Sequence, residues 1–189
     1  CEICVYGEER PEQLQRLGRM FAAIPYNVVS PSRAAMRLWE TSSQLPVKSK
    51  TVHPHCMLRP APIPKSVGRT GRLRIGYLGL PIFHKGWTVF QALLDRYADV
   101  FDFHYLGEVD CGDPRVTWRK VSSGDGADAA ENPMAAAVAA VELDFVVIWP
   151  TWPETFCFVA YEAIAGGAQI ITNRDSGNVA DLVETERVG

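Results

Sequence analysis

Residues 144–172 read DFVVIWPTWPETFCFVAYEAIAGGAQIIT, and this stretch decides the fold. Two apolar runs, 144–150 and 168–172, have the composition of buried strands. Between them, apolar residues from Phe156 to Ile164 recur at helical spacing, and Gly166-Gly167 is suited to end the helix. A strand, a helix and a second strand in this order indicate parallel pairing. The predicted fold class is therefore α/β, a doubly wound, Rossmann-like parallel sheet.

The same alternation extends towards the N-terminus. Further strands are expected at 73–79, 101–106 and 116–121, and helices after Lys85-Gly86 and over 134–141. These elements assign residues 68–189 to one domain. Residues 1–67 are expected to be a partial N-terminal extension, the remnant of another domain plus a linker, because so short a segment cannot build a sizeable core.

Within residues 1–67, apolar spacing predicts a helix over 10–24 and a strand over 26–29. A second helix should begin near Ser30-Pro31-Ser32, capped by Ser30 or Ser32. Five prolines lie between residues 41 and 71, so this stretch is expected to be a linker.

Composition limits the classes of function. The 189-residue chain has a net charge of -3, which argues against non-specific nucleic-acid binding. No apolar run approaches the ~20 residues that span a bilayer. The first residues include neither Met nor a basic segment, so we expect no signal peptide and a piece of a longer chain. Five cysteines, an odd number, indicate a reduced, cytoplasmic protein. Cys1 and Cys4 have metal-ligand spacing, but without a second pair we expect free thiols and no metal.

Three loops are expected at the carboxyl edge of the sheet, where ligands of open α/β sheets bind. One carries Gly79 and Lys85, one carries Glu154 with Glu162 two helical turns further on, and one spans 173–178, where Ser176 or Asn178 could cap the next helix. Carboxylates suit sugar hydroxyls, and a helix N-terminus beside a lysine suits a pyrophosphate. Together these groups suit a sugar nucleotide.

Purely structural interpretations remain open for two of these loops. The Gly79 loop lacks both the dinucleotide and the P-loop glycine patterns, so it could be a tight turn with an exposed lysine. The helix after Glu154 could be an ordinary amphipathic core helix, on which Glu162 would be solvated.

These motifs together resemble the donor-binding half of a retaining GT-B glycosyltransferase of the large family-4 type. The resemblance covers about residues 68–189 and extends more weakly to residues 28–32. It rests on 153–167 with its two glutamates, on Ser176-Gly177-Asn178, and on Gly79 with Lys85-Gly86. It implies a GT-B C-terminal domain that binds a nucleoside-diphosphate sugar, in an enzyme of polysaccharide or glycoconjugate assembly.

The resemblance also implies a role for each matching position. Glu154 would contact the donor sugar and Glu162 the ribose, while Lys85 would neutralise the leaving diphosphate beside Gly79. Backbone groups of Phe156, Cys157 and Phe158 would hold sugar and phosphate. No cofactor or metal is implied. The acceptor would be a glycan or lipid-linked sugar held by an N-terminal domain that is largely missing here, and the full-length enzyme could associate peripherally with a membrane.

The sequence departs from the family pattern at three positions. Leu80 stands where the family commonly has an arginine, and Thr155 and Cys157 stand where glycines are often found. Because the acceptor domain would also be largely absent, we expect the chain alone to lack turnover. Two alternatives stay open: a GT-B nucleotide-sugar epimerase, and an α/β binding module without catalysis.

Overall fold

The computed structural model describes residues 7–43, 45–57, 71–122 and 132–189. Within it the chain forms two compact units, Cys1–His55 and Cys56–Gly189. The expected domain boundary at 67/68 falls outside the described residues, as do Cys1 and Cys4 with their metal-ligand spacing. In the described part of the chain, no helix is both long and apolar enough to cross a membrane.

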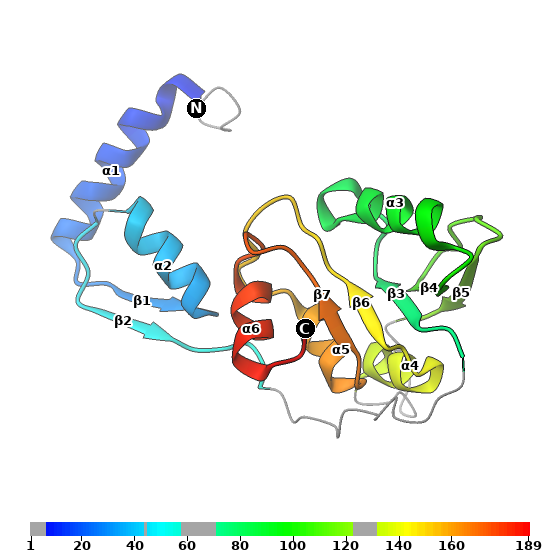
Figure 1. Cartoon of the computed structure of the whole chain (residues 1–189). Coiled ribbons are helices and arrows are strands. Elements are labelled where there is room, and N and C mark those ends of the chain that lie inside the picture. The colour runs from blue at the N-terminus through cyan, green and yellow to red at the C-terminus, as the bar shows by residue number, and fades with distance from the viewer. Residues whose placement is uncertain (1–6, 44, 58–70, 123–131) are drawn as a thin grey trace. The chain divides into compact units, whose positions relative to one another are not determined.

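The first unit contains two helices and a two-stranded parallel sheet (Figure 1). A 3-10 turn η1 (Gly7–Glu9) leads into α1 (Arg10–Ala23), and β1 (Asn27–Ser30) pairs in parallel with β2 (Ser49–Val52). Between the strands runs α2 (Arg33–Ser42), where Ser32 Oγ accepts a hydrogen bond from Ala35 N at 3.0 Å, so Ser32 is the cap. The expected linker is therefore wrong over 49–52. All four residues of β2 are exposed, so no apolar periodicity marks it; its pairing with β1 makes it a strand.

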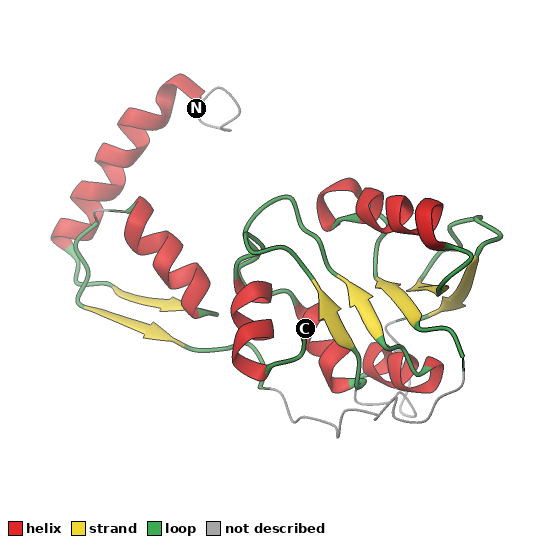
Figure 2. Ribbon diagram, viewed as in Figure 1, coloured by secondary structure: helices red, strands yellow, loops and turns green. Residues whose placement is uncertain are grey.

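The second unit is built on a five-stranded, all-parallel sheet in the order β5-β4-β3-β6-β7, which confirms the predicted fold class (Figures 1 and 2). Because the order reverses between β3 and β6, this sheet has the switch point at which open α/β sheets bind ligands. In chain order, the unit consists of β3 (Arg74–Leu78), η2 (Phe83–Lys85), α3 (Trp87–Tyr97), β4 (Asp102–Gly107), β5 (Val116–Lys120), α4 (Pro133–Val141), β6 (Phe145–Val147), α5 (Phe158–Ala165), β7 (Gln169–Ile171) and α6 (Asn178–Glu186).

Helices cover both faces of this sheet, and alternation along each strand divides the core in two. On β3, Ile75 and Tyr77 pack towards α3, whereas Leu78 packs towards α4 and α5. Figure 1 shows α3 on one face and α4 and α5 on the other. Phe90 of α3 is fully buried, and burying a side chain of this kind contributes ~1.5–3 kcal/mol. Strands buried on both faces explain why the apolar runs are almost continuous.

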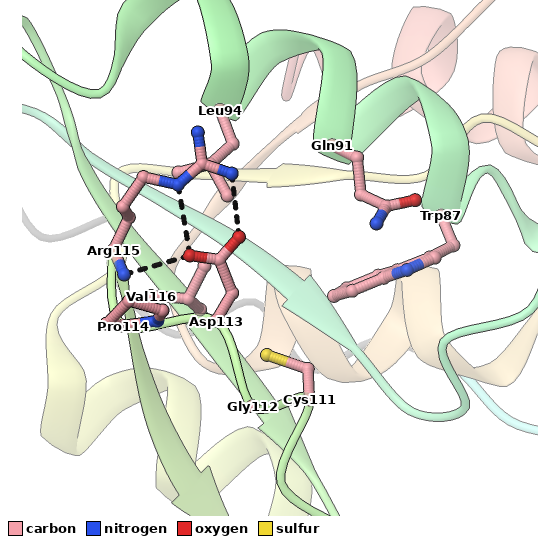
Figure 3. Close-up of a pocket in the computed structure, with 9 residues that line it drawn as sticks. All are labelled: Trp87, Gln91, Leu94, Cys111, Gly112, Asp113, Pro114, Arg115 and Val116. Atoms are coloured by element: carbon pink, nitrogen blue, oxygen red, sulfur yellow. Dashed lines mark hydrogen bonds and ion pairs between the residues drawn. The ribbon is translucent and has the colours of Figure 1, made fainter.

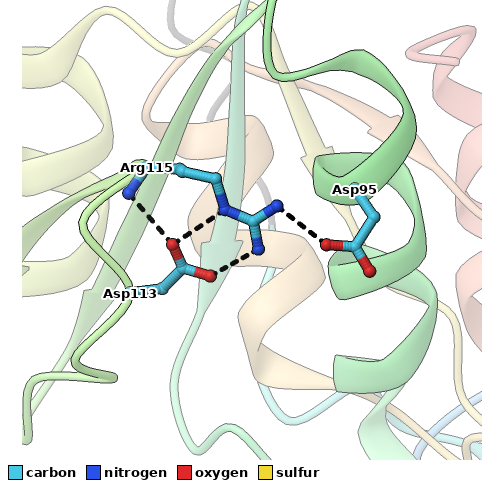
Figure 4. A network of polar contacts seen from close by, with 3 residues as sticks. All are labelled: Asp95, Asp113 and Arg115. Atoms are coloured by element: carbon cyan, nitrogen blue, oxygen red, sulfur yellow. Dashed lines mark hydrogen bonds and ion pairs between the residues drawn. The ribbon is translucent and has the colours of Figure 1, made fainter.

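The β4–β5 connection contains no helix, and an ion-pair network holds it against α3 (Figure 4). The Arg115 guanidinium bonds Asp113 through Nε at 3.0 Å and Nη2 at 2.7 Å, and bonds Asp95 of α3 through Nη1 at 2.8 Å. Hydrogen bonds from Arg115 lower the pKa of Asp113 to about 2. Arg115 thus fixes the loop at a place where a βαβ unit would have a helix.

Candidate functional site

The carboxyl ends of β3, β6 and β7 bring the three predicted loops together, and backbone hydrogen bonds join them. Thr151 N donates to His84 O at 3.1 Å, which links the Lys85 loop to the Glu154 loop. Glu154 N donates to Ser176 O at 3.1 Å, which links the Glu154 loop to the loop after β7. The predicted convergence of three loops on one edge of the sheet is confirmed.

The two residues proposed as catalytic form an ion pair at this edge. Lys85 Nζ lies 2.6 Å from Glu154 Oε1, although 69 residues separate them along the chain. The Glu154 side chain is only 10% exposed, whereas the Lys85 side chain is 42% exposed. A carboxylate so far removed from water needs a partner, because an unpaired buried charge is costly.

Gly86 allows the Lys85 loop to approach the Glu154 loop closely. Its φ is +88°, and a Cβ at this position would lie 2.5 Å from Trp149 O. The 3-10 turn η2 therefore ends with Lys85 beside the end of β6, rather than within the first turn of α3.

Aromatic rings form an exposed rim next to the ion pair. The imidazole of His84 stacks on Trp152, with ring centroids 4.5 Å apart and planes at 21°. Lys85 Nζ lies 6.0 Å from the centroid of the Trp152 ring, within the range of a cation–π interaction. The sequence contained no signal for the His84–Trp152 stack, because the two residues are 68 positions apart in the chain.

The start of α5 holds the three residues whose backbone groups were predicted to bind the donor. Phe156 is buried and stacks on Tyr161 at 4.3 Å, whereas Phe158 is 55% exposed. Cys157 has φ +67°, a left-handed conformation that suits the glycine often found at this position. Burial raises the pKa of the Cys157 thiol to about 11, so the thiol is protonated at neutral pH and inert as a nucleophile.

Three of the proposed site residues lie close enough to the Cys157 thiol to act on its pKa. After burial, the charges that act on this thiol include those of Glu154, Lys85 and Glu162. The two glutamates and the lysine are thus close enough to share one electrostatic environment.

Glu162 is half-buried on α5, which does not fit the alternative interpretation in which its side chain would be solvated. Burial raises its pKa above the ordinary value, and a hydrogen bond with Asn132 opposes that shift. The Glu162 charge in turn helps to raise the pKa of Cys56, which places Cys56 in the same neighbourhood. Sequence reasoning missed Asn132 and Cys56, since neither stands at a characteristic spacing from Glu162.

Neither Ser176 nor Asn178 caps α6 as expected. The residue before the helix is Gly177, without a side-chain cap. Ser176 Oγ donates to Asn173 O at 2.8 Å, and Asn178 Nδ2 donates across the fold to Phe156 O at 2.8 Å. The two side chains therefore bond to the loop after β7 and to the Glu154 loop, and neither of them caps α6.

Gly79 directly follows β3, and two tyrosines hold the backbone of Gly79 and Leu80. Tyr105 Oη donates to Gly79 O at 3.0 Å, and Tyr77 Oη donates to Leu80 O at 2.9 Å. Within 4 Å, a Cβ at Gly79 would meet only Val159, so the backbone there has room on its open side. The Leu80 side chain is 63% exposed.

A hollow of about 470 Å³ lies elsewhere, between α3 and the β4–β5 loop (Figure 3). Trp87 and Gln91 of α3 face Cys111 and the Asp113–Arg115 segment across it. None of the predicted site residues lines it. Among the described residues, no group of three or more His, Cys, Asp or Glu side chains is placed to hold a metal ion.

No protein-family model matches the chain, and no curated protein matches it significantly. Among solved structures, a chain of the GtfA/B complex is similar to it, with a TM-score of 0.53 and 13% sequence identity. The alignment covers 77% of this chain and 30% of that one, so the present chain spans less than a third of the length of its match. At this identity the likeness shows a shared parallel α/β fold.

Proposed function

We propose that this chain contains the nucleotide-sugar donor site of a retaining GT-B glycosyltransferase. The observation that carries the proposal is the Lys85–Glu154 ion pair of 2.6 Å at the carboxyl edge of β3 and β6. It joins a cation and a carboxylate, the two charges that a sugar diphosphate needs, at the switch point of the sheet. The likeness to a chain of the GtfA/B complex supports the fold on which the proposal rests.

The ion pair leaves Lys85 able to bind a phosphate. An ammonium has three N–H donors, and the hydrogen bond to Glu154 uses one of them. Lys85 is also the more exposed partner. With the N-terminus of α5 beside it, Lys85 would stabilise charge on a departing diphosphate, while Glu154 would accept hydrogen bonds from sugar hydroxyls.

Glu162 would bind the ribose two turns further along α5. A half-buried carboxylate with a raised pKa carries an unfavourable desolvation cost in the ligand-free protein. Two vicinal hydroxyls would replace the lost water with hydrogen bonds. The site thus divides into a part for the sugar and diphosphate, at Glu154 and Lys85, and a part for the nucleoside, at Glu162.

Isothermal titration calorimetry with uridine, guanosine and adenosine diphosphates tests the proposal, followed by the matching sugar nucleotides. Glu162→Ala should weaken every ligand that contains the nucleoside. Glu154→Ala should spare the nucleoside diphosphate and weaken only the intact sugar nucleotide. Glu184→Ala, an exposed carboxylate on α6, is the matched control and should change neither affinity.

Failure of a folded chain to bind any of the three diphosphates would leave a non-catalytic α/β module as the better explanation. If Glu154→Ala weakened the affinity for the nucleoside diphosphate and for the sugar nucleotide equally, the division of the site into two parts would be contradicted. Turnover requires the full-length protein. There, release of free nucleoside diphosphate with sugar transferred to an acceptor distinguishes a transferase from a GT-B nucleotide-sugar epimerase.

A further inference from the structure

Asn178 is a buried amide at the first position of α6, and its hydrogen bonds reach back to the Glu154 segment. The residue is 6% exposed. Its backbone N–H donates to Glu154 O at 2.8 Å, and its side-chain Nδ2 donates to Phe156 O at 2.8 Å and to Tyr161 Oη at 3.3 Å. One residue therefore holds the segment at two carbonyls that are two residues apart.

The loop before Asn178 holds Glu154 from the other side. Glu154 N donates to Ser176 O, so the backbone N–H and C=O of Glu154 both bond to residues 176–178. Gly177 pairs with Glu154 in an isolated parallel bridge. Because both backbone polar groups of Glu154 are engaged, the direction in which its side chain leaves the backbone is largely determined.

The side chain of Asn178 takes no part in capping α6, because the N-cap residue is Gly177 and Asn178 is the first residue inside the helix. An asparagine caps a helix from the N-cap position, where its side-chain oxygen accepts a hydrogen bond from a backbone N–H of the first turn. Here the amide donates instead to a loop 22 residues earlier in the chain. The hydrogen bond from Asn178 Nδ2 to Phe156 O is not needed to cap α6. It ties the 154–156 segment to the start of α6.

From this geometry we infer that Asn178 is a positioning residue, which holds the Glu154 carboxylate in contact with Lys85. The consequence for a bound sugar nucleotide rests on the proposed function. The effect on the ion pair itself does not, since the 2.6 Å contact forms without a ligand.

A double-mutant cycle on the ion pair tests the inference without any ligand. Lys85→Met and Glu154→Gln, singly and together, give the coupling between the two side chains from urea unfolding. We expect a coupling of about fivefold in the unfolding equilibrium constant, the upper end for partly exposed pairs. In the Asn178→Ala background the coupling should fall below about twofold, since the side-chain bond to Phe156 O that completes the hold on the 154–156 segment is lost, while the backbone bonds to Glu154 remain.

Asn173→Ala is the matched control in the same cycle. Asn173 stands on the same loop, but its Nδ2 donates to Pro150 O at 3.3 Å and its Oδ1 accepts from Asp175 N at 2.9 Å, so neither of these side-chain bonds involves the 154–156 segment. Its replacement should preserve the coupling. Should Asn178→Ala fail to fold, Asn178→Ser keeps a polar side chain at the helix start while it shortens the reach to Phe156 O. A coupling that is unchanged in the Asn178 variant would overturn the inference.

A calorimetric measurement separates this inference from the proposed function. Asn178→Ala should weaken the sugar nucleotide about as much as Glu154→Ala does, leave the nucleoside diphosphate unchanged, and add nothing in the Glu154→Ala background. Absence of binding by the unmodified chain would refute the proposed function, while the coupling cycle would still decide the role of Asn178. Equal weakening of both ligands by Asn178→Ala would show general loosening of the fold and would refute positioning.

Discussion

Gly177→Ala should be one of the most damaging small substitutions in the chain. At Gly177 the backbone has φ +67° and ψ -121°, which a residue with a Cβ adopts only under strain of ~1–3 kcal/mol. The new Cβ would also lie 2.6 Å from Glu154 O and 2.7 Å from Glu154 N. Both are backbone atoms and cannot rotate away, so overpacking should add ~1–3 kcal/mol. We expect a total loss of ~3 kcal/mol in the free energy of unfolding.

Comparison with Gly112→Ala separates the overpacking from the backbone strain. Gly112 has a comparable φ of +72°, but a Cβ there would meet nothing within 4 Å. It should therefore incur only the backbone strain, ~1 kcal/mol.

Urea unfolding followed by tryptophan fluorescence measures the difference between the two variants. With a slope of ~1–3 kcal/mol/M, the midpoint of Gly177→Ala should lie about 1 M below that of Gly112→Ala at unchanged slope. Equal midpoints for the two variants would refute the argument, because they would mean that the loop moves away from the Cβ at no cost. The Glu154 backbone would then not be held as tightly as its contacts indicate.

Three further predictions concern single side chains. Leu80→Arg should tighten nucleoside-diphosphate binding about twofold to fivefold, the effect of one partly exposed charge pair. Calorimetry that finds equal affinities for Leu80→Arg and Leu80→Gln would contradict this prediction. The pKa of the Cys157 thiol is raised from 9.0 to about 11, so its stability contribution is complete below pH 9 and is lost as the pH rises towards 11. In Cys157→Ala the unfolding midpoint should therefore fall less steeply between pH 9 and pH 11 than it does in the unmodified chain. Parallel curves of midpoint against pH for the two proteins would contradict this prediction. Burial also raises the pKa of Glu162, so its contribution is present below pH 4.5 and is lost as the pH rises through the raised pKa. Glu162→Gln should accordingly raise the unfolding midpoint at pH 7 while it weakens nucleotide binding, with Glu184→Gln as the unaffected control.

Local periodicity was enough to predict most elements of the second unit. The apolar runs of β3 and β6 are buried on both faces, and such runs are visible in the sequence without any knowledge of their neighbours. In contrast, β2 is exposed at every residue, and only its hydrogen bonds to β1 make it a strand. The exposure of the Glu162 side chain likewise depends on the tertiary structure, because whether a helix face is solvated depends on what packs against it.

The sequence by itself determined the parallel sheet, the helices between its strands, and the three loops that meet at one edge. It could do so because strand and helix periods are local properties, and parallel strands with helical crossovers place every such loop on the same side. Only the tertiary structure decided that Lys85 reaches Glu154 across 69 residues, and that Asn178 bonds to Phe156 in place of capping α6. Such contacts depend on the register of β3, β6 and β7 and on the rotamers of long polar side chains, and no local pattern encodes either.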